Sequence, residues 1–196
     1  MVETQNQRER RFNNNASQAM FIGNRSMDSV LDSDRMELAE IGGSFEAIAG
    51  RMQELVEWAR AKGYVLGHEE QSAYMEPVYQ KWKGKIDAAE GDPTVKEKVW
   101  KEYGIEWGAR MAEHPKTWYD PKVAVVQMLN TRGIQQCPFE DCNTNCWNED
   151  VNIVSRKTGK QLAINRGTAH LAREHNLLEK DNGYGITPRE FYEGFM

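Results

Sequence analysis

Three cysteines within ten residues are the side chains in this sequence that most clearly suggest a chemical role. Cys137, Cys142 and Cys146 lie in the stretch CPFEDCNTNC, and the other 186 residues contain no cysteine. Two histidines follow, His170 and His175, in the spacing H-x4-H. Two thiolates and two imidazoles form a tetrahedral ligand set that zinc prefers. The pattern therefore predicts a structural zinc ion held by Cys137, Cys142, His170 and His175.

The second thiolate has an alternative, because Cys146 could replace Cys142 or remain a buried thiol. An odd number of closely spaced cysteines is a poor disulfide framework and a better ligand set. The competing interpretation is that all three are ordinary buried thiols and that the histidines make local hydrogen bonds. Three cysteines and two histidines within 39 residues favour the metal over this interpretation.

The order of paired cysteines, hairpin, short helix and paired histidines resembles the architecture of C2H2 zinc fingers. The resemblance covers about 40 residues and implies a ligand set, not DNA readout. Two features depart from that family. The separation from Cys142 to His170 is far longer than the linker of about twelve residues in a finger, and the expected hairpin follows the cysteines instead of carrying them.

A catalytic metal site is a further alternative, because the second histidine follows an acid in the order H-x-x-x-E-H. Glu174 would be the general base of a metal-dependent hydrolase. Zinc hydrolases use H-E-x-x-H or H-x-x-E-H, so the spacing here differs by one residue. Four protein ligands also leave no coordination position for the reactive water. We therefore expect no catalytic residues, although the enzyme alternative stays open.

Basic residues offer a nucleic-acid alternative. The hairpin at 156–160 and the helix at 169–175 would form the interface, and the candidate phosphate contacts are Arg156, Lys157, Lys160 and Arg166. The chain as a whole has a net charge of −5 and a pI near 5.5, which argues against a surface broadly suited to nucleic acid. Acidic residues near the cysteines also weaken the local positive potential.

Helical periodicity dominates the region from 34 to 117. Apolar residues recur every three or four positions over 36–62, and similar patterns over 69–87 and from Pro93 to about 113 predict two further helices. A small bundle of about three helices fits these patterns. Residues 1–33 are polar and are expected to form a flexible tail.

The region 118–196 is expected to hold the zinc-binding α+β domain. Alternation over 151–154 and 161–164 predicts a hairpin, and a short helix should follow at 169–175. A helix this short is marginal in water, so a metal would have to pin it. Because positions i and i+5 lie about 140° apart, the last turn should loosen at His175. Residues 122–130 could be a strand or a helix.

These observations predict an α+β protein with an N-terminal helical part and a zinc-stabilised hairpin and short-helix unit. The N-terminus has no apolar signal segment and no run is long enough to span a membrane, so we expect a cytoplasmic protein. The preferred function is non-catalytic, binding and regulatory, with another protein as the expected partner and zinc as a structural cofactor.

Overall fold

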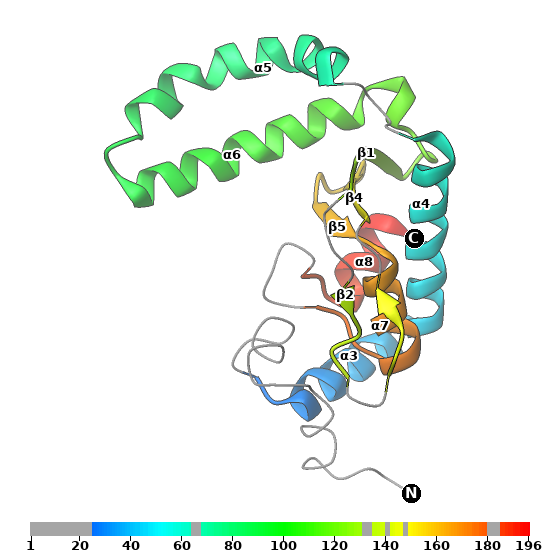
Figure 1. Cartoon of the computed structure of the whole chain (residues 1–196). Helices are drawn as coiled ribbons and strands as arrows, with labels where there is room; N and C mark the ends of the chain where they lie inside the picture. Colours follow the sequence, from blue (N-terminus) through cyan, green and yellow to red (C-terminus); the bar gives the residue numbers. More distant parts are fainter. Residues whose placement is uncertain (1–24, 64–67, 131–134, 140–141, 147–148, 180–184) are drawn as a thin grey trace, which may run out of the picture.

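The protein combines helices with a small antiparallel sheet (Figure 1). The computed structural model describes residues 25–63, 68–130, 135–139, 142–146, 149–179 and 185–196. In these residues the helices that precede the sheet are α3 (Met27–Ile41), α4 (Phe45–Lys62), α5 (His68–Ala88), α6 (Pro93–Ala112) and a short 3-10 helix (Pro115–Thr117). The expected mixed class with N-terminal helices is confirmed. No helix in the described ranges has both the length and the apolar character needed to cross a bilayer.

The main sheet has the strand order β1-β4-β5, with β1 at Val123–Asn130, β4 at Glu149–Ser155 and β5 at Gln161–Ile164. All neighbours are antiparallel, and Val125 pairs with Ile153, which pairs with Leu162. The strands β4 and β5 are the hairpin that the alternating pattern predicts. Two helices follow, α7 (Arg166–His175) and α8 (Pro188–Phe195).

The sheet is buried on both faces. This explains why residues 122–130 do not show the clear alternation of apolar and polar residues that marks a half-buried strand. Val123 and Val125 pack into the largest core with α4, whereas Ala124 and Val126 pack against the base of α5 and α6. A strand covered on both sides shows a continuous apolar run instead of a period of two. The undecided segment is therefore the strand β1.

The expected helix over 36–62 is two helices, separated at Gly42–Ser44. Gly42 ends α3 in the left-handed conformation with φ of 64°, and Ser44 caps α4 by accepting from the amide of Ala47 at 3.1 Å. A Cβ atom at Gly43 would lie 2.6 Å from Cζ of Tyr192, so α8 approaches the backbone closely here. Helix α3 begins at Met27, inside the range expected to be a tail, and residues 1–24 lie outside the described residues.

The largest core joins both sides of residue 117. Helix α4 contributes Ile48, Leu55 and Ala59, and these pack with sheet residues and with Phe191 and Phe195 of α8. Helix α4 therefore packs on the sheet and α7 instead of forming a bundle with α5 and α6. The reason is its apolar stripe, which is completed by the strands that follow later in the chain.

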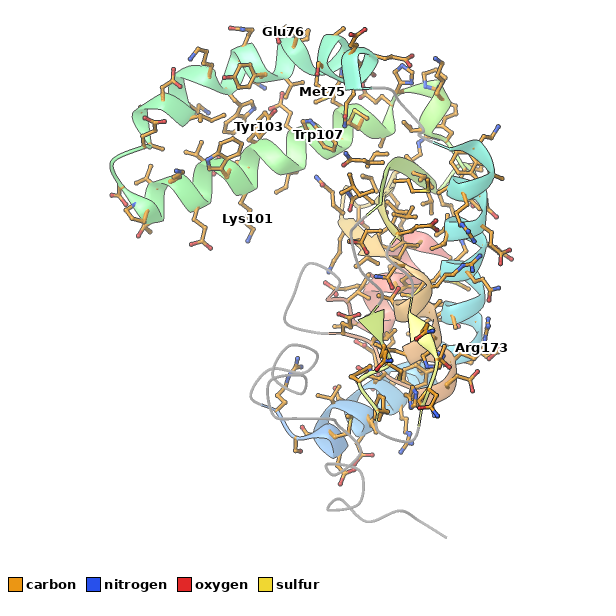
Figure 2. The ribbon with its side chains drawn as sticks, in the orientation of Figure 1. Met75, Glu76, Lys101, Tyr103, Trp107 and Arg173 are labelled. Carbon is orange, nitrogen blue, oxygen red and sulfur yellow. The ribbon has the colours of Figure 1, made fainter. Side chains whose placement is uncertain are left out.

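Helices α5 and α6 form a hairpin that extends away from the sheet (Figure 1). Asp92 caps α6 by accepting from the amides of Thr94 and Val95, as its position before Pro93 predicts. Aromatic side chains, including Tyr103 and Trp107, lie between the two helices (Figure 2). Pro77 is accommodated inside α5, which runs through it.

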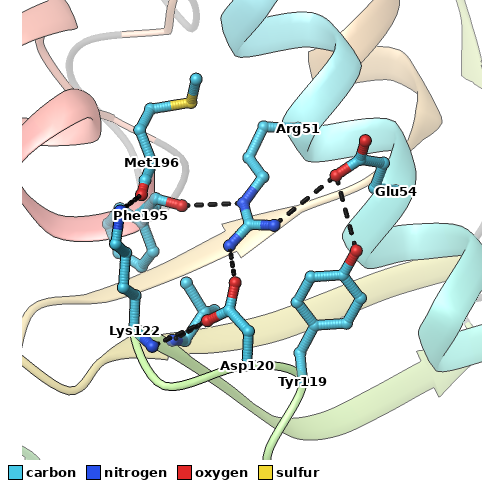
Figure 3. Close-up of polar contacts among 8 residues, drawn as sticks. Arg51, Glu54, Tyr119, Asp120, Lys122, Phe195 and Met196 are labelled. Atoms are coloured by element: carbon cyan, nitrogen blue, oxygen red, sulfur yellow. Dashed lines mark hydrogen bonds and ion pairs between the residues drawn. The ribbon is translucent and has the colours of Figure 1, made fainter.

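A polar network connects α4 to the loop before β1 and to the end of α8 (Figure 3). The Arg51 guanidinium pairs with Asp120, and its Nε donates to the carbonyl of Phe195 at 2.8 Å. Asp120 also accepts from the amides of Lys122 and Val123, at 2.7 and 2.8 Å. Burial opposes the ionised form of Asp120, but the hydrogen bonds from Arg51 and the two amides prevail and lower its pKa.

Candidate metal centre

A second, very short hairpin carries the cysteines. Strand β2 (Gln135–Gln136) pairs with β3 (Asn145–Cys146), and the amide of Cys137 extends the ladder by donating to the carbonyl of Thr144 at 3.0 Å. The amide of Cys142 donates to the carbonyl of Phe139 at 3.1 Å. Cys137 and Cys142 therefore lie on the turn between two strands. The expected hairpin after the cysteines is β4–β5. The hairpin β2–β3 that carries them was not predicted, because two-residue strands are too short to show alternation.

Helix α7 presents both histidines. Asn165 caps it and forms a reciprocal capping box with Thr168, with distances of 2.9 and 3.0 Å between each amide and the opposite side chain. The helix therefore begins at Arg166, with Thr168 at its third position. The sequence predicted a start at 169, because threonine at 168 is a common N-cap residue. Asn176 ends the helix in the left-handed conformation with φ of 52°. Arg173 fixes α7 to α4 through Gln53 and Glu46, at 2.8 and 3.3 Å.

The four predicted ligands converge. One ligand atom from each of Cys137, Cys142, His170 and His175 lies within 4.8 Å of all the others. Nε2 of His170 is 3.2 Å from Sγ of Cys142, and Nε2 of His175 is 3.3 Å from Sγ of Cys137. These residues lie close enough to hold a metal ion.

The histidines converge at the end of α7, where the H-x4-H spacing suggested a loosened turn: the amide of Asn176 donates to the carbonyl of Leu171, five residues back instead of the four of a regular α-helix. His175 is the last helical residue, and the two imidazole centroids are 5.2 Å apart at an interplanar angle of 73°. Both rings use Nε2, the nitrogen farthest from the backbone. This reach compensates for the angular separation of positions i and i+5 around the helix.

The donor set fits a tetrahedral ion. Bonds of about 2.3 Å to sulfur and about 2.0 Å to nitrogen place tetrahedral ligands roughly 3.3–3.8 Å apart. The two thiol–imidazole separations are close to that range, and small side-chain rotations would bring the widest pair into it. Two sulfur and two nitrogen donors of this kind suit zinc or another ion that accepts soft ligands.

Apolar packing encloses one side of the site. Cys137 is only 1% exposed, and the imidazole of His175 stacks on Phe139 with centroids 3.9 Å apart. A separate core surrounds them, and its other members come from α3, from the middle of α7 and from the segment just after α7. Its buried residues are Met27, Val30, Leu31, Cys137, Phe139, Leu171 and Leu177. Helix α3 therefore covers the cysteine hairpin and α7 together.

Burial also favours the metal-binding form of an imidazole. Burial lowers the pKa of His170, although nearby Glu174 acts in the opposite direction. An imidazole with a lowered pKa is neutral at pH 7, and the neutral form has the lone pair that binds a metal. The hydroxyl of Thr144 lies 3.4 Å from Sγ of Cys142, where it can hydrogen-bond a thiolate.

Two further candidates for the site are the alternate ligand Cys146 and the candidate general base Glu174. The side chain of Cys146, the alternate ligand, lies outside the described residues, so the choice between Cys142 and Cys146 remains a prediction. Glu174 is exposed on α7 and is not among the four convergent residues. The four convergent residues would complete a tetrahedral coordination shell, so this geometry gives the hydrolase alternative no coordination position for a reactive water.

Three of the candidate phosphate contacts lie in the connection between β4 and β5, and the fourth, Arg166, begins α7. Lys160 pairs with Glu190 at 2.6 Å, and the guanidinium of Arg156 lies 4.0 Å from the centroid of Trp118. Lys157 is exposed at the hairpin tip, while Arg166 starts α7 beyond the other end of β5.

Sequence reasoning missed the contribution of α3. The signal was present, because Met27, Val30 and Leu31 recur at helical spacing after Ser26, which caps the helix by accepting from the amide of Ser29 at 3.2 Å. The polar composition of the preceding residues concealed it.

Comparison with known proteins adds no relative: no protein-family model, curated protein or solved structure matches this chain. The functional argument therefore rests on the chemistry of the four convergent side chains and on the surfaces around them.

Proposed function

We propose that this chain is a non-catalytic binding protein in which a structural zinc ion stabilises the unit formed by the hairpin β2–β3 and α7. The observation that carries the proposal is the convergence of Cys137, Cys142, His170 and His175 within 4.8 Å. A complete set of four protein ligands is typical of structural zinc, because catalytic zinc keeps a position for water or substrate.

The surroundings of the site support a structural role. Cys137 is buried, the hairpin β2–β3 is minimal, and α7 has only ten residues. Elements this small do not persist alone in water, and a metal that joins them supplies the missing stabilisation. Glu174 is exposed, which fits a solvated helix residue better than a general base beside a reactive water.

Exposed apolar side chains support macromolecular recognition. Trp100 and Ile105 on α6 are 44% and 55% exposed. Large apolar residues with this exposure on a projecting helix hairpin are typical of contact surfaces, where aromatic anchors contribute most of the affinity. Protein is the preferred partner, because the chain is acidic and the candidate phosphate contacts Arg156 and Lys160 are engaged within the protein.

Purification of the tagged full-length chain from its native cell tests the proposal in one preparation. Zinc, bound proteins and bound nucleic acid are quantified for the native chain and for His170→Asn. We expect one zinc per chain and a stoichiometric partner protein in the native chain, and His170→Asn should lose the zinc but keep the partner, because the exposed surface of α6 belongs to a core separate from the metal centre. Co-purification of nucleic acid alone, with affinity that falls steeply with salt, would instead support the nucleic-acid alternative.

A further inference from the structure

An open pocket of about 450 Å³ lies between α5, α6 and β1, on the opposite side of the sheet from the largest core. Two helical stripes form its walls. On α5 the stripe has the spacing of three and four residues that places side chains on one face, and α6 contributes two aromatic rings one turn apart. The lining is Gln71, Ser72, Met75, Glu76, Tyr79, Tyr103, Trp107 and Gln127.

The lining is aromatic and carries one charge. Tyr79, Tyr103 and Trp107 supply three rings, and Glu76 supplies a carboxylate; none of the described lining residues is basic. Figure 2 shows Tyr103 and Trp107 on α6, across from Met75 on α5. Tyr79 is 39% exposed and Glu76 is exposed, so both stand at the mouth of the pocket. Aromatic faces with an adjacent carboxylate attract cations and repel anions.

The polar groups of the lining favour a guanidinium over an ammonium. Gln71 and Ser72 bring oxygens that accept hydrogen bonds, and Gln127 keeps a second lone pair on the oxygen that accepts from Asn152 at 3.3 Å. A guanidinium carries five N–H donors in one plane. The same chemistry recurs within this chain, where Arg110 lies 4.2 Å from the ring centroid of Tyr74. Glu76 accepts from the side-chain amide of Gln80 at 2.7 Å, a neutral contact that orients the carboxylate and leaves its charge in place.

We propose that this pocket binds an arginine side chain of a partner protein, stacked on Trp107 and Tyr103 and paired with Glu76. The exposed Trp100 lies on the same face of α6, with its ring centroid 5.5 Å from that of Tyr103, and provides apolar surface for the residues that flank such an arginine in its own chain. The inference goes beyond the proposed function, because the pocket and the metal centre belong to separate cores. It shares with that function only the assumption of a protein partner.

A peptide titration tests the pocket. The metal-loaded full-length protein is titrated with short Gly-Ser peptides that carry one arginine, one lysine or one citrulline, the neutral isostere of arginine. Binding is followed by the NMR signal of the Trp107 indole N–H. We expect saturable binding of the arginine peptide, weaker binding of the lysine peptide, and binding of the citrulline peptide that is at least about threefold weaker than that of arginine.

Matched variants locate the interaction. Glu76→Gln should weaken the arginine peptide about three- to tenfold and leave the citrulline peptide unchanged. Glu102→Gln makes the same charge change on the exposed surface of α6, outside the lining, and should leave binding unchanged. Circular dichroism melting curves confirm that both variants are folded.

Three outcomes would overturn the inference. They are equal affinity for the arginine and citrulline peptides, equal loss in Glu76→Gln and Glu102→Gln, and the absence of saturable binding. Tighter binding of free guanidinium chloride than of the arginine peptide would overturn the assignment to a protein partner. Measuring zinc content in the same samples separates these outcomes from a failure of the metal centre.

Discussion

The Sγ atom of Cys137 lies 3.3 Å from Nε2 of His175, although 38 residues separate them in the chain. The hairpin β4–β5 of the main sheet lies within that interval, and α7, which follows it, lies beside the cysteine turn. The contact therefore joins two segments that are far apart in the sequence. A metal ion bound there would link the short hairpin β2–β3 to the short helix α7.

Metal removal is expected to loosen one core and spare the other. Chelation should lower the melting temperature by at least about 5 °C, because it removes several kcal/mol from a chain of this size. Hydrogen exchange should increase in α3, around Cys137 and at the end of α7. The paired amides of β4 and β5 belong to the separate sheet core and should remain protected. Uniform loss of protection across both cores would contradict this separation.

Replacement of single ligands distinguishes Cys142 from Cys146. Cys142→Ser and His170→Asn should each lower zinc affinity at least about tenfold, because each removes one of four bonds and leaves its partners unsatisfied. Cys146→Ser is the matched control and should retain one zinc per chain. Competition with a chromophoric chelator measures these affinities. Loss of zinc in Cys146→Ser with retention in Cys142→Ser would assign the second thiolate to Cys146.

Helix α3 should stabilise the metal centre by covering it. Met27 is 2% exposed in the core that contains Cys137, so Met27→Ala should cost about 2–4 kcal/mol of unfolding free energy. Met36 lies on the same helix but is 68% exposed, and Met36→Ala should change stability by less than about 0.5 kcal/mol. Urea denaturation measures both. Similar costs at the two positions would show that α3 is not fixed against the site.

Asp120 should contribute a pH-dependent stabilisation. Its pKa in the folded protein is lowered from the ordinary value of 3.8, so its contribution is complete above that value and is lost as pH falls through the lower folded pKa. The difference in melting temperature between the native chain and Asp120→Asn should therefore be large at pH 7 and shrink below about pH 4. The comparison cancels metal loss, since both proteins have the same ligands. Asp87→Asn, in an exposed pair with Lys83, should show little difference at either pH.

Local patterns in the sequence predicted much of this architecture, and the failures have physical causes. The β4–β5 hairpin, the Asp92 cap and the four convergent ligands follow from alternation, turn chemistry and spacing. The start of α7 was misplaced because Thr168 is a good cap by type, and only the reciprocal hydrogen bonds select Asn165.

Contacts between distant segments account for the remaining differences. Tyr192 fixes the break at Gly43 from 149 positions away, because its hydroxyl accepts a hydrogen bond from the amide of Ser44 at 2.8 Å. The burial of β1 on both faces depends on α4 and on the α5–α6 hairpin at once. Neither relationship produces a periodic pattern of apolar residues that could be recognised in the local sequence. The same is true of the packing of α3 over the cysteine hairpin.

X-ray absorption at the zinc edge of the purified protein tests the metal centre most directly. The account predicts two sulfur ligands at about 2.3 Å and two imidazole nitrogens at about 2.0 Å, with one zinc per chain. A spectrum with three sulfurs, or with a water oxygen in place of an imidazole, would contradict the ligand set, and protein without stoichiometric zinc would contradict the centre itself.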